Sequence, residues 1–170
     1  MQANQQPSSA RASEAPNMVF AVEPFANGAR SVGFSELIEA NYAEMERHKQ
    51  LRKMSLDRAG YDMMDKAGKM RCYSARVGGE LVGYATFFLS RGYRYDVSGA
   101  MAFSDLWFLK PAFRSGDAAA RMLSFVENDM RKNGVIALYM CDPLQRSIWP
   151  LLKWAGFMPI ETTYEKILKK

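Results

Sequence analysis

The chain has 170 residues, of which 48% are hydrophobic and 24% are charged, and its formal net charge is +5. This length and apolar content suffice for one globular domain with its own core. No apolar run reaches the roughly 18 residues that would indicate a membrane span. The positive charge favours anionic partners without identifying one.

Residues 1–17, MQANQQPSSARASEAPN, are rich in Gln, Ser, Ala and Pro. They lack the apolar centre of a signal peptide, so we expect a disordered tail followed by a single domain over 18–170. Cys72 and Cys141 lie in strand-like runs without the paired spacing of a zinc site. We therefore expect reduced core thiols, no bound metal and a cytoplasmic location.

Hydrophobic periodicity predicts the first elements of the domain. Alternation over 18–26 predicts a strand, and the segment 35–50 predicts a helix with one apolar face. Residues 57–68 predict a shorter helix that stops at Gly68. The apolar positions on the longer helix are Leu37, Ile38, Tyr42 and Met45.

A β-hairpin is the clearest local pattern in the chain. Two strand-like runs, 69–77 and 81–89, flank a turn at 78–80 that begins with two glycines. The loop 90–100 is polar and aromatic, and Tyr93 and Tyr95 within it could line a pocket. A further strand is predicted over 100–109.

The last part of the chain predicts a helix, a strand, a helix and a final strand. The first helix ends at Gly134, and the continuous apolar run 135–141 is typical of a strand covered on both faces. Residues 144–157 predict a helix that Pro150 should start or kink. Residues 162–170 predict the last strand. The apolar face of the first of these helices consists of Met122, Leu123, Val126 and Met130.

The junction between the strand that ends at Leu109 and the helix that follows suits a phosphate group. The first backbone N–H groups of a helix lack intrahelical partners, and the helix dipole adds positive potential there. Arg114 would add a cation at the mouth of the turn, and the small run 118–120 would permit close approach of a ligand. A plain β–α turn, with Ser115 as N-cap and Asp117 in the first helical turn, is the alternative.

This junction resembles the acyl-CoA-binding segment of the GNAT superfamily of N-acetyltransferases. In that family a strand ending near a proline leads into Arg/Gln-x-x-Gly-x-Gly/Ala and a helix. Arg114 matches the first motif position and Ala119 the last. Asp117 stands where the family has glycine, and Gly116 lies one position earlier.

Two more sequence motifs carry the resemblance, which extends from about residue 18 to the end. The hairpin contains GGELVGYATFF, with Gly83 in a central strand, and the predicted last helix ends with Gly156 and Phe157. Small bacteriophage members of the family look especially similar over 100–123. The resemblance implies an α/β (α+β) fold with a central mixed, mostly antiparallel sheet of six or seven strands. About four helices flank this sheet in the order β-α-α-β-β-β-α-β-α-β.

The implied activity is transfer of an acetyl group from acetyl-CoA to an amine of a small molecule or protein, through a direct ternary complex. The pantetheine arm would contact the backbone of Leu109. The implied pyrophosphate site consists of Arg114, Ser115, Gly116, Asp117, Ala118 and Ala119.

Asp105 is a polar residue on an otherwise apolar strand and is the candidate general base. A capping or salt-bridged aspartate beside the 91–94 loop is the alternative. Where many family members carry a tyrosine acid, this chain has Leu152, and Tyr139 and Tyr164 are the candidate substitutes.

A carboxylate about 4 Å from a phosphate would repel it by roughly 4 kcal/mol at an effective dielectric near 20. Asp117 must therefore point outward if the turn binds CoA. Asp117 and Leu152 favour a second hypothesis, a catalytically silent binding or assembly module. Such a module could be a phage protein acting on a host partner in the host cytoplasm or in the virion. Nucleic-acid binding is not expected, because basic and aromatic residues do not interleave.

Overall fold

The computed structural model describes residues 17–91 and 99–168. The predicted tail, apart from Asn17, and the loop residues Tyr93 and Tyr95 lie outside these ranges. The described residues form one five-stranded sheet in the order β1-β2-β3-β4-β5. Neighbouring strands are antiparallel, except that β4 and β5 are parallel. The strands are β1 (Met18–Val22), β2 (Met70–Val77), β3 (Glu80–Arg91), β4 (Ala100–Leu109) and β5 (Val135–Tyr139).

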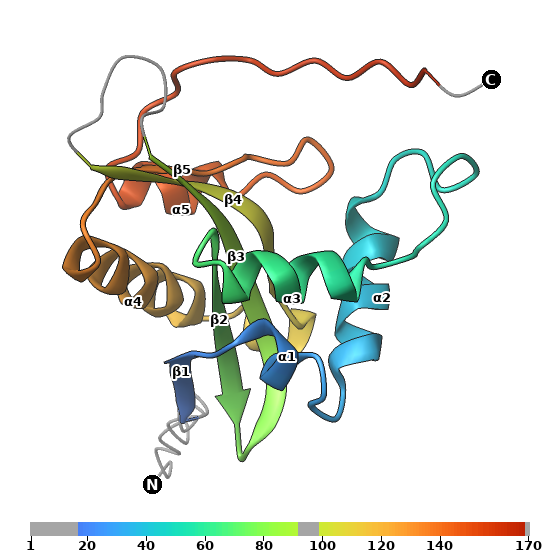
Figure 1. Cartoon of the computed structure of the whole chain (residues 1–170), viewed down its shortest axis with the longest axis horizontal. Helices are drawn as coiled ribbons and strands as arrows, with labels where there is room; N and C mark the ends of the chain where they lie inside the picture. Colours follow the sequence, from blue (N-terminus) through green and yellow to red (C-terminus); the bar gives the residue numbers. More distant parts are fainter. Residues whose placement is uncertain (1–16, 92–98, 169–170) are drawn as a thin grey trace, which may run out of the picture.

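Helices lie on both faces of this sheet (Figure 1). The first three come before β2 in the chain, α4 connects β4 to β5, and α5 follows β5. A single 3-10 turn, η1 (Pro111–Phe113), lies between β4 and α4. The helices are α1 (Phe25–Gly28), α2 (Phe34–Met45), α3 (Arg58–Lys66), α4 (Ala118–Lys132) and α5 (Trp149–Trp154).

The alternation of side chains along the strands divides the core into two parts. On β3, Ala85 and Phe87 face α4, where they join Met122 and Val126. Residues of the other parity, such as Tyr84, face α1 and α2. The strand that precedes the candidate site, β4, contributes to both parts, so both faces of the sheet fix its position.

Most helix and strand boundaries lie where the sequence predicts them, because turn, capping and apolar residues close in the chain set them. Gly78 and Gly79 have φ of 57° and 86°, which suits the tight turn of the predicted hairpin. The Asp57 side chain accepts a hydrogen bond from the Gly60 amide and begins α3. On α4 the predicted apolar stripe is buried against the sheet. The last helix begins beside Pro150, as predicted.

The number of strands is lower than predicted. Residues 158–168 adopt no strand in the structure, so the expected final strand over 162–170 is wrong for its described part, and the sheet has five strands rather than six or seven. The reason is a lack of tertiary partners, because the apolar side chains of this segment, including Ile160 and Tyr164, face solvent. The short α1 was not predicted, and the first strand ends at Val22 instead of residue 26.

The strands β3 and β4 approach each other closely at Gly83. A Cβ at this position would lie 2.4 Å from Leu109 Cδ2 and 2.7 Å from the Phe108 carbonyl oxygen. We expect Gly83→Ala to lower the free energy of unfolding by about 1–3 kcal/mol, as overpacked cores do. Urea denaturation measures this loss.

Gly28→Ala is the matched control, because a Cβ there would meet nothing within 4 Å. This variant should keep or slightly raise the stability of the protein. Equal effects of the two substitutions would show that β3 and β4 can separate at Gly83 without cost.

Candidate active site

A β-bulge in β4 positions the candidate base. Thr86 of β3 pairs with Leu106 and Phe87 pairs with Ser104, so Asp105 is the extra residue between the two pairs. Simple alternation would place Asp105 on the face opposite Leu106, which packs on the α1–α2 side. The bulge instead re-aims its carboxylate toward that side, where α3 also lies.

Two hydroxyl groups hold the Asp105 carboxylate in place. Tyr61 Oη of α3 donates to Asp105 Oδ2 at 2.6 Å, and Thr86 Oγ1 donates to the same oxygen at 3.0 Å. Thr86 Oγ1 also accepts the Leu106 amide at 3.1 Å and thereby closes the bulge. Burial and the neighbouring Asp105 raise the pKa of Tyr61, so the phenol remains a donor. Asp105 itself is exposed.

Neither of these partners was predicted from the sequence. The sequence does contain a signal for Thr86. It is a polar residue in an apolar strand, and it lies on the same face of that strand as Tyr84, two residues earlier. Tyr61 has none, because its role depends on how α3 lies across the sheet. In the described part of the chain, Asp105 accepts hydrogen bonds from these two hydroxyl groups, while Arg94 of the alternative hypothesis lies outside the described residues.

Beside the bulge, β4 separates from β5. Their pairing ends at Phe103 and Tyr139, although β4 continues to Leu109. Ser104 Oγ accepts the Cys141 amide at 3.0 Å and fixes the point of divergence. The Lys110 amide donates to Val82 of β3, so the amides of 107 and 109 face the other way, toward the opening.

A cleft of about 410 Å³ lies on the α2 side of this opening. Asp105 lines it, and Asn41 Nδ2 donates to the buried Tyr84 hydroxyl at 2.7 Å in its wall. Burial raises the pKa of Tyr84, so this phenol stays neutral. The lining comes from α2 (Ile38, Asn41, Tyr42, Met45), its C-cap Glu46, the following loop (52–56), β3 (Tyr84), β4 (104–108) and the segment after β5 (Cys141, Pro143, Arg146, Ile148).

The turn that was predicted to hold a phosphate lies between η1 and α4. Gly116 has φ of 70°, and a Cβ there would meet nothing within 4 Å. Asp117, not Ser115, occupies the N-cap position, and its side chain makes no capping bond. The alternative assignment of Ser115 as N-cap is therefore wrong, because the left-handed Gly116 delays the start of the helix. Ala118 and Ala119 form the first helical turn.

Asp117 points away from the turn, as the charge argument requires. Its side chain is 64% exposed and lies 3.7 Å from Arg121 Nη1, one turn along α4. The carboxylate thus interacts with a cation of its own helix.

Arg114 points inward instead of toward the mouth of the turn. Its Nε donates to the Leu109 carbonyl at 2.7 Å, and its Nη2 donates to Glu44 Oε2 at 2.8 Å. The guanidinium lies 4.9 Å from the centre of the Phe108 ring, and the side chain is 17% exposed. Its charge is therefore engaged within the domain, and its role toward phosphates stays a prediction.

Glu44 connects Arg114 to a second arginine. Arg146 Nη1, from the segment after β5, lies 3.2 Å from Glu44 Oε1. This Arg114–Glu44–Arg146 triad links α2, the turn before α4 and the wall of the cleft. No sequence signal identified Glu44, because its partners are distant in the chain.

The second candidate catalytic residue lies apart from the first. The Tyr139 ring stacks on Phe103 with a centroid distance of 4.6 Å, and its hydroxyl lies 4.0 Å from Met101 Sδ. Among the described residues, those that line the cleft include Asp105 but not Tyr139. Leu152, at the position of the family tyrosine, is buried in the core.

Three comparisons relate the chain to known proteins. The Acetyltransferase (GNAT) family matches residues 34–157, and the chain belongs to this family of acetyltransferases. None of the curated proteins matches the chain in sequence.

Solved structures share the fold at low sequence identity. A ribosomal-protein-alanine N-acetyltransferase from Brucella melitensis biovar Abortus is 12% identical, covering 88% of this chain and 99% of that chain, with a TM-score of 0.64. A predicted acetyltransferase from Clostridium acetobutylicum, with acetyl-CoA, is 13% identical over 89% and 96%, with a TM-score of 0.64. An aminoglycoside acetyltransferase from a soil metagenomic sample, in complex with sisomicin, is 11% identical over 88% and 96%, with a TM-score of 0.64.

Neither a metal-binding group nor a membrane-spanning helix is found within residues 17–91 and 99–168. No group of three or more His, Cys, Asp or Glu in these ranges could hold a metal ion. None of the helices described is long and apolar enough to cross a membrane.

The triad should contribute to stability. We expect Glu44→Ala to lower the free energy of unfolding by about 1–3 kcal/mol, because it leaves the largely buried Arg114 guanidinium without its carboxylate. Chemical denaturation measures the loss. Glu39→Ala, at an exposed position of the same helix, should change stability little. An equally small effect of Glu44→Ala would mean that the ion pairs only offset their own desolvation.

Proposed function

We propose that the protein transfers an acetyl group from acetyl-CoA to an amine through a direct ternary complex, with Asp105 as the general base. The observation that carries this proposal is the bulge, which turns the Asp105 carboxylate into a cleft beside the open edge of β4. A carboxylate at this place can accept the proton that an ammonium acceptor must lose, directly or through a water.

The chain's own groups fit the parts of acetyl-CoA. The first amides of α4 and the open turn at Gly116 suit the pyrophosphate, because they offer donors and room. The amides of 107 and 109 can donate hydrogen bonds to groups placed in the opening. Bound acetyl-CoA would supply the acetyl group as a reactive thioester.

The residues proposed to bind the cofactor are the predicted ones, but the role of Arg114 differs from the predicted role. Backbone groups of Leu109 and of residues 115–119 would contact the cofactor. The guanidinium of Arg114 would act mainly by fixing the Leu109 carbonyl and the turn. Tyr139 remains a proposed acid of lower rank than Asp105, since it packs on Phe103.

The acceptor is proposed only as an amine. Related folds act on chemically different acceptors, as a ribosomal-protein alanine acetyltransferase and an aminoglycoside acetyltransferase illustrate. The cleft lining combines carboxylates, such as Glu46 and Asp105, with cations such as Arg146. This mixture suits a small molecule or a protein N-terminus that carries polar groups near its amine.

A second candidate function is a catalytically silent binding or assembly module. The inward guanidinium of Arg114 and the buried Leu152 favour it, because each removes a polar group that the family places at the cofactor. A phage protein that acts on a host partner or in the virion is one form of this candidate.

Asp105→Asn tests the proposed base. Its kcat/KM should fall by about 10²–10⁴, the usual contribution of general-base catalysis, while acetyl-CoA binding stays unchanged. Acetyl-CoA consumption would be followed with the most active amine from a panel of amino acids, peptides, polyamines and aminoglycosides. Asp62→Asn is the control, because Asp62 pairs with Lys66 on α3. Unchanged kcat/KM in Asp105→Asn would remove the role of Asp105.

Asp117→Asn tests the turn. Removing this charge should tighten acetyl-CoA binding by up to about fivefold, since exposed charges typically interact by about 0.2–1 kcal/mol. Calorimetric titration of the wild type and the variant measures the change, and Asp62→Asn again serves as the control. If neither protein binds acetyl-CoA, the binding module becomes the better assignment.

A further inference from the structure

The two oxygens of the Asp105 carboxylate have different surroundings. Tyr61 Oη and Thr86 Oγ1 both donate to Oδ2, at 2.6 and 3.0 Å. Within the described part of the chain, Asp105 forms no other hydrogen bond and no ion pair. Oδ1 is therefore the oxygen that can interact with a group entering the cleft, which Asp105 lines.

The two hydroxyl groups can act only as donors toward Oδ2. Thr86 Oγ1 accepts the Leu106 amide at 3.1 Å, so its own proton is directed to Asp105. Tyr61 keeps its proton, because burial raises the pKa of its phenol. A carboxylate oxygen accepts about two hydrogen bonds, and these two donors already occupy Oδ2. A proton that Asp105 accepts must then bind to Oδ1.

The remaining titratable groups behind Asp105 are neutral. Burial, with smaller contributions from Asp65 and Asp105, raises the pKa of the Cys72 thiol on β2 to about 12. Burial also raises the pKa of Tyr84 on β3. None of the ionisable side chains elsewhere in the cleft lining pairs with Asp105; they are Tyr42, Glu46, Arg52, Lys53, Cys141 and Arg146. The hydroxyl groups are therefore the direct partners of this charge.

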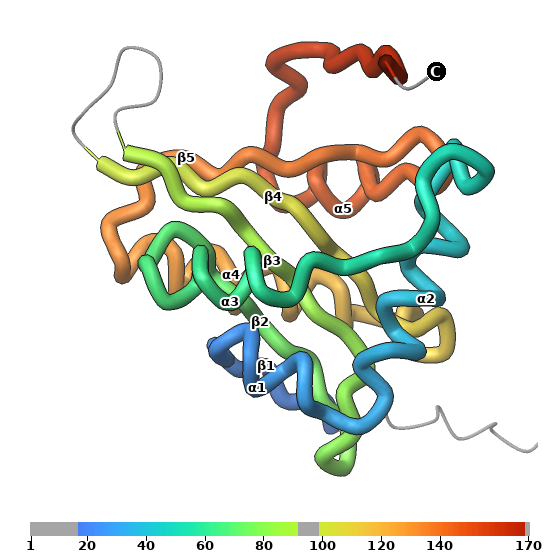
Figure 2. Tube along the Cα trace, turned by 45° about the vertical axis from the view of Figure 1, so that its right-hand side comes forward, coloured from blue at the N-terminus to red at the C-terminus, as the bar shows by residue number. Residues whose placement is uncertain are grey.

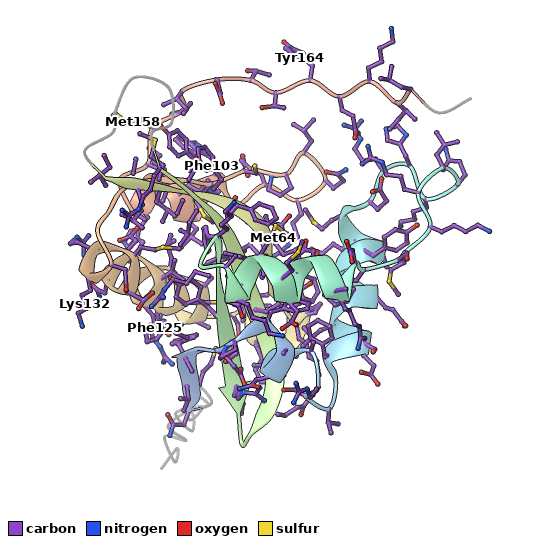
Figure 3. The ribbon with its side chains drawn as sticks, in the orientation of Figure 1. Met64, Phe103, Phe125, Lys132, Met158 and Tyr164 are labelled. Atoms are coloured by element: carbon purple, nitrogen blue, oxygen red, sulfur yellow. The ribbon has the colours of Figure 1, made fainter. Side chains whose placement is uncertain are left out.

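Packing of the Tyr61 ring fixes the position of its hydroxyl group. The ring centre lies 5.0 Å from that of Phe25 and 6.3 Å from that of Phe88. In Figures 1 and 2 the helix α3 crosses the sheet in front of β2 and β3, and Met64 of this helix, labelled in Figure 3, packs on the same apolar cluster. The Asp65 carboxylate also accepts the Phe25 amide at 2.7 Å. The ring can therefore lose its hydroxyl group and keep its place.

We propose that Tyr61 is a positioning residue for the general base, and that Asp105 accepts the proton of the acceptor amine on Oδ1 while Tyr61 and Thr86 hold Oδ2. This inference rests on the proposed acetyl transfer. In the proton transfer, an N–H bond of the ammonium group breaks and an O–H bond forms at Oδ1, directly or through a water. The electron pair of the broken bond stays on nitrogen, which becomes the nucleophile.

Tyr61→Phe removes one donor from Oδ2 and keeps the ring. The ionised carboxylate loses a stabilising hydrogen bond, so the acid side of the profile of kcat/KM against pH should move to higher pH by about 0.5–1 unit. On that side of the profile, kcat/KM should fall by about three- to tenfold, while the Kd of acetyl-CoA stays unchanged. Thr86→Ser keeps both hydrogen bonds of the hydroxyl group and should retain the wild-type profile.

Tyr73→Phe is the matched control. Tyr73 Oη donates to Asp129 Oδ2 at 2.7 Å, so this variant loses the same kind of hydrogen bond on the α4 face of the sheet. Its profile of kcat/KM against pH should be that of the wild type. An equal shift in Tyr73→Phe and Tyr61→Phe would overturn the assignment of Tyr61.

An NMR titration of the Asp105 side-chain carboxyl carbon separates this inference from the proposed function, because it needs no substrate. The midpoint should rise by about 0.5–1 unit in Tyr61→Phe and stay unchanged in Tyr73→Phe. A raised midpoint in a protein that acetylates no amine would support the hold on Oδ2 and overturn the proposed function. An active protein in which Tyr61→Phe changes neither the midpoint nor the profile would overturn the inference and leave the proposed function standing.

Discussion

The candidate site depends on one extra residue in β4. The bulge shifts the alternation of β4, since Ala102 and Leu109 both face α4, and Asp105 lies at this shift with its carboxylate toward Tyr61 and Thr86. The same stretch of strand parts from β5 just beyond Phe103. The Asp105 carboxylate and the unpaired edge of β4 therefore lie close together, because the bulge and the end of the β4–β5 pairing fall at neighbouring residues. Tyr61 of α3 and Thr86 of β3 donate hydrogen bonds to the Asp105 carboxylate, so these two elements preorganise the site.

The Arg114–Glu44–Arg146 triad changes how anion binding at this site should be understood. The net charge of +5 suggests a cation for phosphate, and Arg114 stands at the expected motif position. Glu44 neutralises it from another element, while the stacked Phe108 ring limits its motion. Phosphate affinity at the turn must then come mainly from the backbone amides and the helix dipole. Such a site is sensitive to a neighbouring charge, and for that reason the outward orientation of Asp117 matters.

Local periodicity made the fold predictable from sequence. The glycine turn of the hairpin, the short helix predicted over 57–68 and the apolar stripe of α4 each depend on residues that are close in the chain, and the structure confirms all three. The candidate site was harder to predict from the sequence. Asp105 was found because a charge interrupts an apolar run, but a bulge leaves no trace in periodicity. The orientation of Arg114 depends on Glu44, which is 70 residues away, and sequence spacing carries no information on such a contact.

The failed prediction of a last strand has a different origin. Residues 158–168 do carry the alternation of a strand, but a strand gains its stability from neighbours, and α5 directs this segment away from its own β5. Family resemblance implies six or seven strands, whereas the described residues form five. Alternation alone does not make a strand, and the apolar side chains of Ile160 and Tyr164 therefore stay exposed.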